Sequence, residues 1–69
     1  MHPVAVTEQH GALLRPEQVA EILGIGRTKL YVMIRKGELP VLRVGRLVRI
    51  PEREFETWMS ERITVPKVA

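Results

Sequence analysis

Three residues separate two helix-like runs in this chain, and this short joint limits the possible folds more than any other feature. Gly24-Ile25-Gly26 follows the run "RPEQVAEIL" and precedes the run "RTKLYVMIRK". Apolar residues three and four apart give each run one face that can be buried. A glycine-containing joint of this length cannot lay the two helices antiparallel as a long loop could, so we expect them to cross at a steep angle.

The ends of both helices can be predicted from their terminal residues. Pro16 suits a first helical turn, Glu17 suits the positive end of the helix dipole, and Gly24 is a natural C-terminal stop. These signals predict a first helix over 16–23 and a second over 27–36, which Gly37 closes. The residues predicted to face the core are Val19, Ile22 and Leu23 on the first helix and Leu30, Met33 and Ile34 on the second.

The stretch "VLRVGRLVRI", residues 41–50, predicts a β-hairpin whose register depends on the length of its loop. A two-residue loop, Gly45-Arg46, would mix apolar and charged side chains on both faces of the hairpin. A three-residue loop, Gly45-Arg46-Leu47, would separate them and set Arg43 directly across from Arg49. We expect the second register, because it gathers the apolar residues on one face of the hairpin. Since like charges that face each other are unfavourable unless an anion lies over them, this register also points to an anionic partner. The buried face would then consist of Leu42, Val44, Val48 and Ile50.

A last helix is predicted from Pro51 onward, with acidic residues in its first turn. Trp58, the only tryptophan, is expected to anchor the small core. Residues 1–12 and 64–69 have no periodicity and are predicted to be flexible tails on one domain of residues 13–63. The core positions expected on the last helix are Phe55, Trp58, Met59 and either Ile63 or the stem of Arg62.

The length and the charge of the chain limit the classes of function that it can have. A chain of 69 residues without cysteine is too small for a deep substrate cleft and excludes disulfides and thiolate metal sites. No stretch is long and apolar enough to span a membrane. Residues 27–49 carry seven cations and one acid, a charge of +6, whereas the rest carries four cations and seven acids. A basic block of this kind points to a polyanion such as nucleic acid.

The expected order is helix, tight turn, helix, hairpin and helix, which is an α+β, mostly α, winged helix-turn-helix. Residues 13–59 closely resemble the excisionase-like DNA-binding domains related to the MerR superfamily. The resemblance is most specific in "VAEILGIGRTKLYVMIRKGELP", in "RVGRLVRIP" and in the tryptophan that follows. The chain departs from the family pattern at Arg15 and Gly26, where the family usually has Ser or Thr caps, and at Val32, where many members are basic.

The resemblance implies binding to double-stranded DNA. The second helix, 27–36, would lie in a major groove, and the wing tip, Gly45 to Leu47, would reach the neighbouring minor groove or backbone. Small members of this family act as recombination directionality factors: they coat and bend attachment-site DNA so that an integrase excises a prophage or mobile element.

The candidate DNA contacts lie on the second helix and on the wing. Arg27 could contact guanine through two hydrogen bonds, and Thr28 a thymine methyl group or a phosphate. Tyr31 shares their face or covers the core, whereas Lys29 turns partly aside. Cations in the last helical turn also favour the helix dipole without any ligand. The expected contacts are Arg27, Thr28, Lys29, Tyr31, Arg35 and Lys36 on the helix, and Arg43, Gly45, Arg46 and Arg49 on the wing.

Catalysis is not expected, because the sequence has no acid-base pair, phosphate loop or metal-ligand cluster. His2 and His10 are interpreted as tail residues, and no cofactor or small-molecule substrate is predicted. We expect a bacterial cytoplasmic excision factor that associates head to tail on DNA and serves an integrase. Two alternatives stay open: a small MerR-like transcriptional regulator of the same fold, and a module whose basic face binds an acidic protein partner.

Overall fold

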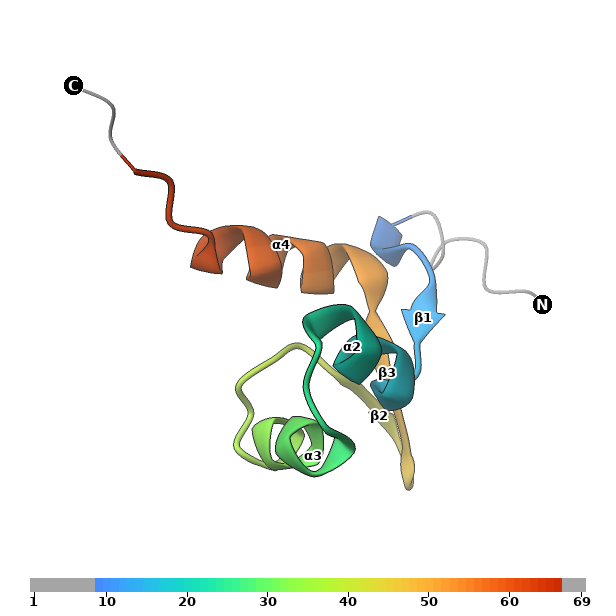
Figure 1. Cartoon of the computed structure of the whole chain (residues 1–69). Coiled ribbons are helices and arrows are strands. Elements are labelled where there is room, and N and C mark those ends of the chain that lie inside the picture. The colour runs from blue at the N-terminus through green and yellow to red at the C-terminus, as the bar shows by residue number, and fades with distance from the viewer. Residues whose placement is uncertain (1–8, 67–69) are drawn as a thin grey trace.

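The computed structural model describes residues 9–66 (Figure 1). Helices α2, α3 and α4 of the described residues accompany a small antiparallel sheet with the strand order β1-β3-β2, so the predicted winged helix-turn-helix architecture is confirmed. Helix α2 packs against both α3 and β3, and α4 continues directly from the end of β3. The elements are β1 (Leu13–Leu14), α2 (Pro16–Leu23), α3 (Arg27–Arg35), β2 (Leu42–Val44), β3 (Leu47–Pro51) and α4 (Glu52–Arg62).

Helix α2 has the bounds predicted from its sequence. Arg15 occupies the N-cap position, and the side chain of Gln18 reaches back to accept a hydrogen bond of 2.9 Å from the Arg15 backbone N–H. This contact satisfies one exposed amide at the start of the helix without a Ser or Thr cap. At the other end Gly24 adopts a left-handed conformation, with a φ of 67°, and ends the helix.

The core confirms most of the predicted positions but excludes Ile22, Leu42 and Val44, which are exposed. Ile22 is 56% exposed, because α2 faces the core through Pro16, Val19, Ala20 and Leu23 and turns Ile22 outward. Met33 is only partly buried beside the core. The fully buried apolar residues are Val19, Ala20, Leu30, Ile34, Leu39, Ile50 and Phe55.

The predicted hairpin register is wrong. Strands β2 and β3 are joined by the two-residue turn Gly45-Arg46, which pairs Val44 with Leu47 and Arg43 with Val48. Gly45 has a φ of 58°, and glycine at the first position of a two-residue loop allows a tight turn that matches the twist of the strands. The turn therefore fixes the register, and Arg43 and Arg49 lie on opposite faces of the hairpin instead of facing each other.

Helix α4 is anchored by its aromatic residues. Phe55 is fully buried, and its ring stacks on Trp58 with 5.9 Å between the centroids. Trp58 is partly buried and donates a hydrogen bond of 2.6 Å from its indole N–H to the Glu38 carbonyl oxygen. The guanidinium of Arg62 lies 4.0 Å from the centre of the Trp58 ring, but Arg62 is exposed, so its stem does not fill the predicted core position. Ile63 is 66% exposed and lies beyond the helix.

The residues before β1 contact the domain. The Ala12 carbonyl accepts a hydrogen bond of 2.8 Å from the Glu52 N–H, and the Glu52 side chain accepts one of 3.1 Å from the Ala12 N–H. Nδ1 of His10 is hydrogen-bonded to Oε2 of Glu54. Contacts with the domain thus begin before residue 13, although residues 1–8 of the predicted tail, including His2, lie outside the described residues. At the other end, residues 67–69 also lie outside them.

Strand β1 was not predicted. Leu13 pairs with Pro51 and Leu14 with Ile50, which adds a short third strand beside β3. Two residues are too few for alternation to reveal a strand in the sequence. The strand places Leu14 against the core and leaves Leu13 37% exposed on the outer face of the sheet.

Candidate nucleic-acid interface

Helix α3 offers an exposed polar face near its N-terminus. Leu30 and Ile34 are buried and fix the helix on α2, while Arg27, Thr28 and Lys29 are exposed. Tyr31 is 39% exposed, so its ring is not buried in the core. Among the described residues no side chain caps the first turn, which also contains no acid. Its free amide N–H groups and the positive end of the helix dipole favour an anion such as phosphate.

The C-terminal end of α3 is joined to the wing. Nη2 of Arg43 donates a hydrogen bond of 3.2 Å to the carbonyl oxygen of Ile34. The last carbonyl groups of a helix carry partial negative charge, so a guanidinium there is favourable. Arg35 and Lys36 are exposed at the same end of the helix. Arg43 thereby links β2 to α3.

The tip of the wing combines one cation with two apolar side chains. Arg46 is exposed in the turn after Gly45. The flanking pair, Val44 and Leu47, is 60% and 47% exposed. With the longer loop, Val44 was expected in the core, and Leu47 was expected at the wing tip but not among the individual DNA contacts. The two-residue loop, which was considered but not chosen, would have predicted the exposed apolar pair at the tip.

Arg49 lies apart from the other predicted wing contacts. Its partner across the sheet is Leu42, on the outer face of the sheet. The side chain is half-buried, and Nη1 donates a hydrogen bond of 2.8 Å to the neighbouring Val48 carbonyl. The structure brings α3 and the wing turn to one side of the molecule but places Arg49 on a separate flank.

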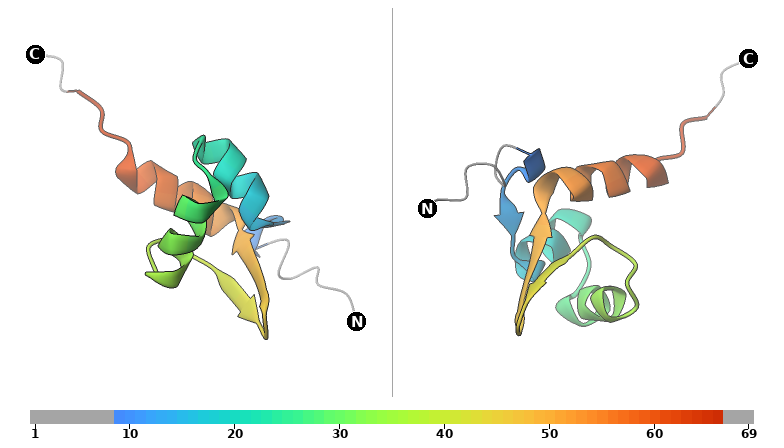
Figure 2. Two further views of the ribbon diagram at one scale, coloured as in Figure 1. Left: turned by 60° about the horizontal axis from the view of Figure 1, so that its bottom comes forward. Right: turned by 180° about the vertical axis from the view of Figure 1, so that it is seen from behind.

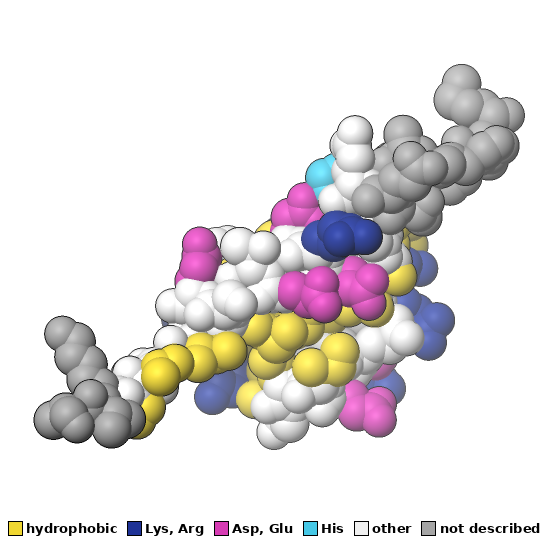
Figure 3. Space-filling view, turned by 90° about the horizontal axis from the view of Figure 1, so that it is seen from above, with side chains coloured by type: hydrophobic (Ala, Val, Ile, Leu, Met, Phe, Trp, Pro, Cys, Tyr) yellow, Lys and Arg dark blue, Asp and Glu magenta, His cyan; other side chains and the backbone are white. Residues whose placement is uncertain are grey.

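The charges of the molecule are divided between two sides. Helix α3 and the turn of the wing project from the side opposite α4 (Figures 1 and 2). Seen from above α4, acidic side chains are scattered over the surface together with an apolar area, and a basic side chain lies among them (Figure 3). Helix α4 carries four glutamates against Arg53 and Arg62, and α2 carries two glutamates and no cation, whereas α3 contains no acid at all. An approaching polyanion is therefore favoured on the α3 side and repelled by α4.

The described residues contain no cluster of three or more His, Cys, Asp or Glu side chains that could hold a metal ion. Within residues 9–66, no helix is both long and apolar enough to cross a membrane. His10 is engaged with Glu54, which corrects its interpretation as a simple tail residue.

Two packed helices joined by a three-residue turn and followed by a two-stranded wing define a helix-turn-helix DNA-binding domain. Residues 13–63 match the family described as "Helix-turn-helix domain", so the chain belongs to this family. The excisionase-like resemblance is confirmed by a relative from Saccharopolyspora erythraea described as "Probable excisionase". That protein is 39% identical over 57 residues, which are 83% of this chain and 58% of the relative.

A second relative, "Uncharacterized protein YvgK" of Bacillus subtilis (strain 168), is 35% identical over 54 residues, or 77% of this chain and 18% of that protein. The chain thus spans a little over half of the first relative and about a fifth of the second. No solved structure matches the chain. The family membership and the likeness to an excisionase both point to a DNA-binding protein rather than to a catalyst.

Proposed function

We propose that this protein is a double-stranded DNA-binding excision factor that directs an integrase toward removal of a prophage or other mobile element. The observation that carries the proposal is the grouping of α3 and the wing turn on one cationic side, opposite the acids of α4 (Figure 1). The relative described as "Probable excisionase" supports the choice of this role over others of the same fold.

In the proposed complex α3 enters a major groove. Arg27 reads a guanine, Thr28 contacts a thymine methyl group or a phosphate, and Tyr31 packs against the groove wall. Lys29, Arg35 and Lys36 bind phosphates along the strands. These contacts position the domain and give it a preferred base sequence.

The wing binds the adjacent minor groove. Arg46 enters the groove, where the negative potential of narrow A·T-rich segments attracts a guanidinium. The exposed apolar pair Val44 and Leu47 lies against the sugars and can help to open base steps, which bends the duplex. Arg43 contacts a phosphate between α3 and the wing, and Arg49 contacts the backbone from the outer face of the sheet.

A single small domain covers only part of a helical turn of DNA, so useful specificity requires several copies in a row. We propose cooperative, head-to-tail binding along the attachment site in the bacterial cytoplasm. The protein itself carries out no catalytic step, and the integrase performs strand exchange. No cofactor or small molecule takes part.

Recombination with the cognate integrase tests the proposal directly. Excision and integration are scored with and without the protein, and we expect excision to rise and integration to fall. Unchanged recombination together with altered transcription would identify a MerR-like regulator instead. Absence of any salt-dependent affinity for duplex DNA would favour the third alternative, a basic module that binds an acidic protein.

The matched control is the double variant Arg27→Ala/Arg46→Ala. Both side chains are exposed, so the variant should fold normally while losing contacts in both grooves. If this variant stimulates excision as well as the parent does, the proposed DNA interface is wrong.

A further inference from the structure

A groove on the outer face of the sheet lies apart from the proposed contacts of α3 and the wing turn. Its volume is about 360 Å³, and its lining is mainly apolar. The pairing of β1 with β3 brings Leu13 and Pro51 together there, and Leu42 of β2 lies on the same face. The residues that line the groove are His10, Leu13, Pro40, Val41, Leu42, Pro51 and Glu54.

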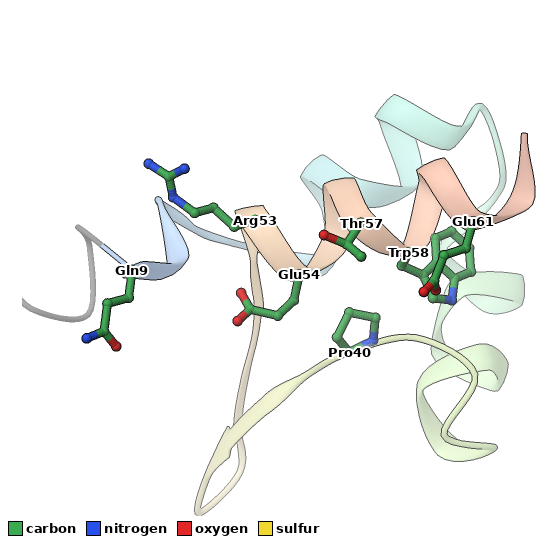
Figure 4. A pocket seen from close by; sticks show the side chains of 7 residues that line it. All are labelled: Gln9, Pro40, Arg53, Glu54, Thr57, Trp58 and Glu61. Carbon is green, nitrogen blue, oxygen red and sulfur yellow. The ribbon is translucent and has the colours of Figure 1, made fainter.

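This groove continues along α4. A second hollow of about 510 Å³ shares Pro40 and Glu54 with it and extends to Trp58 and Glu61. Figure 4 shows Pro40 across from the side chains of α4 that line this hollow. The second hollow is more polar, because Arg53, Glu54 and Glu61 all line it, so the apolar part lies at the sheet.

Within residues 9–66, no helix or strand covers the sheet face beside the groove. Helix α2 packs on the opposite face of β3, and Leu13 and Leu42 remain 37% and 39% exposed. Contiguous exposed apolar surface on a small domain commonly marks an interaction site. The two-residue turn created this surface, because it set Leu42 on the outer face.

A segment with matching properties follows α4. Ile63 and Val65 are 66% and 77% exposed, and Ile63 has the extended φ and ψ of −76° and 124°. In an extended chain residues two apart point to the same side, so both apolar side chains can enter one groove.

The segment cannot readily reach the groove of its own chain. It leaves α4 at the end remote from β1 (Figures 1 and 2). Glu54, at the groove, and Ile63 are separated by nine helical steps, or about 13 Å. The groove of a neighbouring copy, in contrast, can lie next to the segment that follows α4.

We propose that the Ile63–Pro66 segment of one copy binds in the groove between β1, β2 and α4 of a second copy. Donor and acceptor surfaces differ and lie at opposite ends of α4, so the contact is head to tail and can repeat from copy to copy. This inference rests on the proposed cooperative binding to DNA and names the surfaces that would produce it.

Cysteine trapping tests the contact, because the natural sequence contains no cysteine. The full-length double variant Leu42→Cys/Val65→Cys is oxidised on duplexes that carry one or two adjacent sites. We expect covalent dimers on the two-site duplex and none on the single-site duplex. The control, Ile22→Cys/Val65→Cys, uses a comparably exposed residue on α2 and should not cross-link.

Absence of cross-links in the Leu42→Cys variant, or equal cross-linking in the control, would overturn the docking proposal. If single-site binding persists in that case, the proposed DNA-binding function still stands, and the groove must serve another partner such as the integrase. If the parent protein does not bind either duplex, both proposals fall together.

A second measurement uses Ile63→Ser/Val65→Ser. Because burying two aliphatic side chains is favourable, their loss should reduce cooperativity between adjacent sites by about tenfold or more. Affinity for a single site should stay within about twofold of the parent protein, because the segment lies outside the proposed DNA contacts. Unchanged cooperativity in this variant would contradict the proposal.

Discussion

The guanidinium of Arg43 is hydrogen-bonded to the carbonyl oxygen of Ile34, which ties the wing to the last turn of α3. A side chain selected from the sequence only as a phosphate contact therefore also has a structural role. In the proposed complex both elements bind DNA, so the relative placement of helix and wing must match the spacing of adjacent grooves.

Arg43 and Arg46 are expected to differ when each is replaced by alanine. Arg46→Ala should weaken binding to all DNA sequences without changing the free energy of unfolding. Arg43→Ala should weaken binding and also lower the free energy of unfolding by about 0.5 to 1.5 kcal/mol, because it removes an intramolecular hydrogen bond. Urea denaturation followed by circular dichroism, together with DNA titrations, separates the two effects. Equal stability of both variants would show that the Arg43 contact contributes nothing.

Arg27 is expected to determine base preference. Arg27→Ala should relax discrimination at one base position by about 1 to 3 kcal/mol, because it removes a paired contact to a base edge. Lys29→Ala is the matched control, since it removes a cation from the same turn without the proposed base contact. Binding to a library of single-base variants of the site measures the preference. An unchanged preference would mean that another residue reads this base.

Salt should weaken DNA binding steeply. If about six cations meet phosphates, the logarithm of the affinity should fall with the logarithm of salt concentration with a slope near −5. Titrations across a series of salt concentrations provide the measurement, and Arg46→Ala should reduce the slope by about 1. A slope shallower than about −2 would argue against the proposed interface.

The two aromatic residues of α4 should contribute differently to stability. Phe55→Ala should cost about 3 to 5 kcal/mol, because this ring is fully buried in the core. Trp58→Phe keeps an aromatic ring but removes the hydrogen bond to Glu38, and it should cost about 1 kcal/mol. Thermal and urea unfolding by circular dichroism would measure both. A larger loss for Trp58→Phe than for Phe55→Ala would reverse their roles.

Gly11 should be more sensitive to substitution than other glycines with positive φ. Its φ is 72°, and a Cβ atom built there would lie 2.6 Å from Oε1 of Glu52. Gly37 has a φ of 69° but open space around it, so Gly37→Ala isolates the cost of the backbone conformation. Gly11→Ala should release residues 10–12 and speed hydrogen exchange of the Glu52 amide. Protection of that amide equal to the parent would show that the segment tolerates a side chain.

Local signals predicted the helices well. Pro16, Gly24 and Gly37 mark ends that depend on a few neighbouring residues, and the structure follows them closely. Ile22 was misassigned because a helix of two turns allows several apolar faces, and only packing against α3 and β3 decides among them.

Features that depend on tertiary context could not be predicted in the same way. The hairpin followed the turn preference of Gly45 at the expense of burying Leu42 and Val44, so apolar patterning was a poor guide to its register. Strand β1 forms because Leu14 pairs with Ile50, which lies 36 residues later in the sequence. Of the proposed wing contacts, Arg49 depended most on the assumed register and is the one displaced to another flank.

The hydrogen bond from Trp58 to Glu38 gives the protein a natural optical reporter. The indole is the only one in the chain, and its bonding partner lies in the loop that leads from α3 to β2. Fluorescence emission from this single chromophore is therefore sensitive to movement of that loop. Any rearrangement of α3 and the wing on DNA binding can therefore be followed in real time through the Trp58 fluorescence of the unlabelled protein.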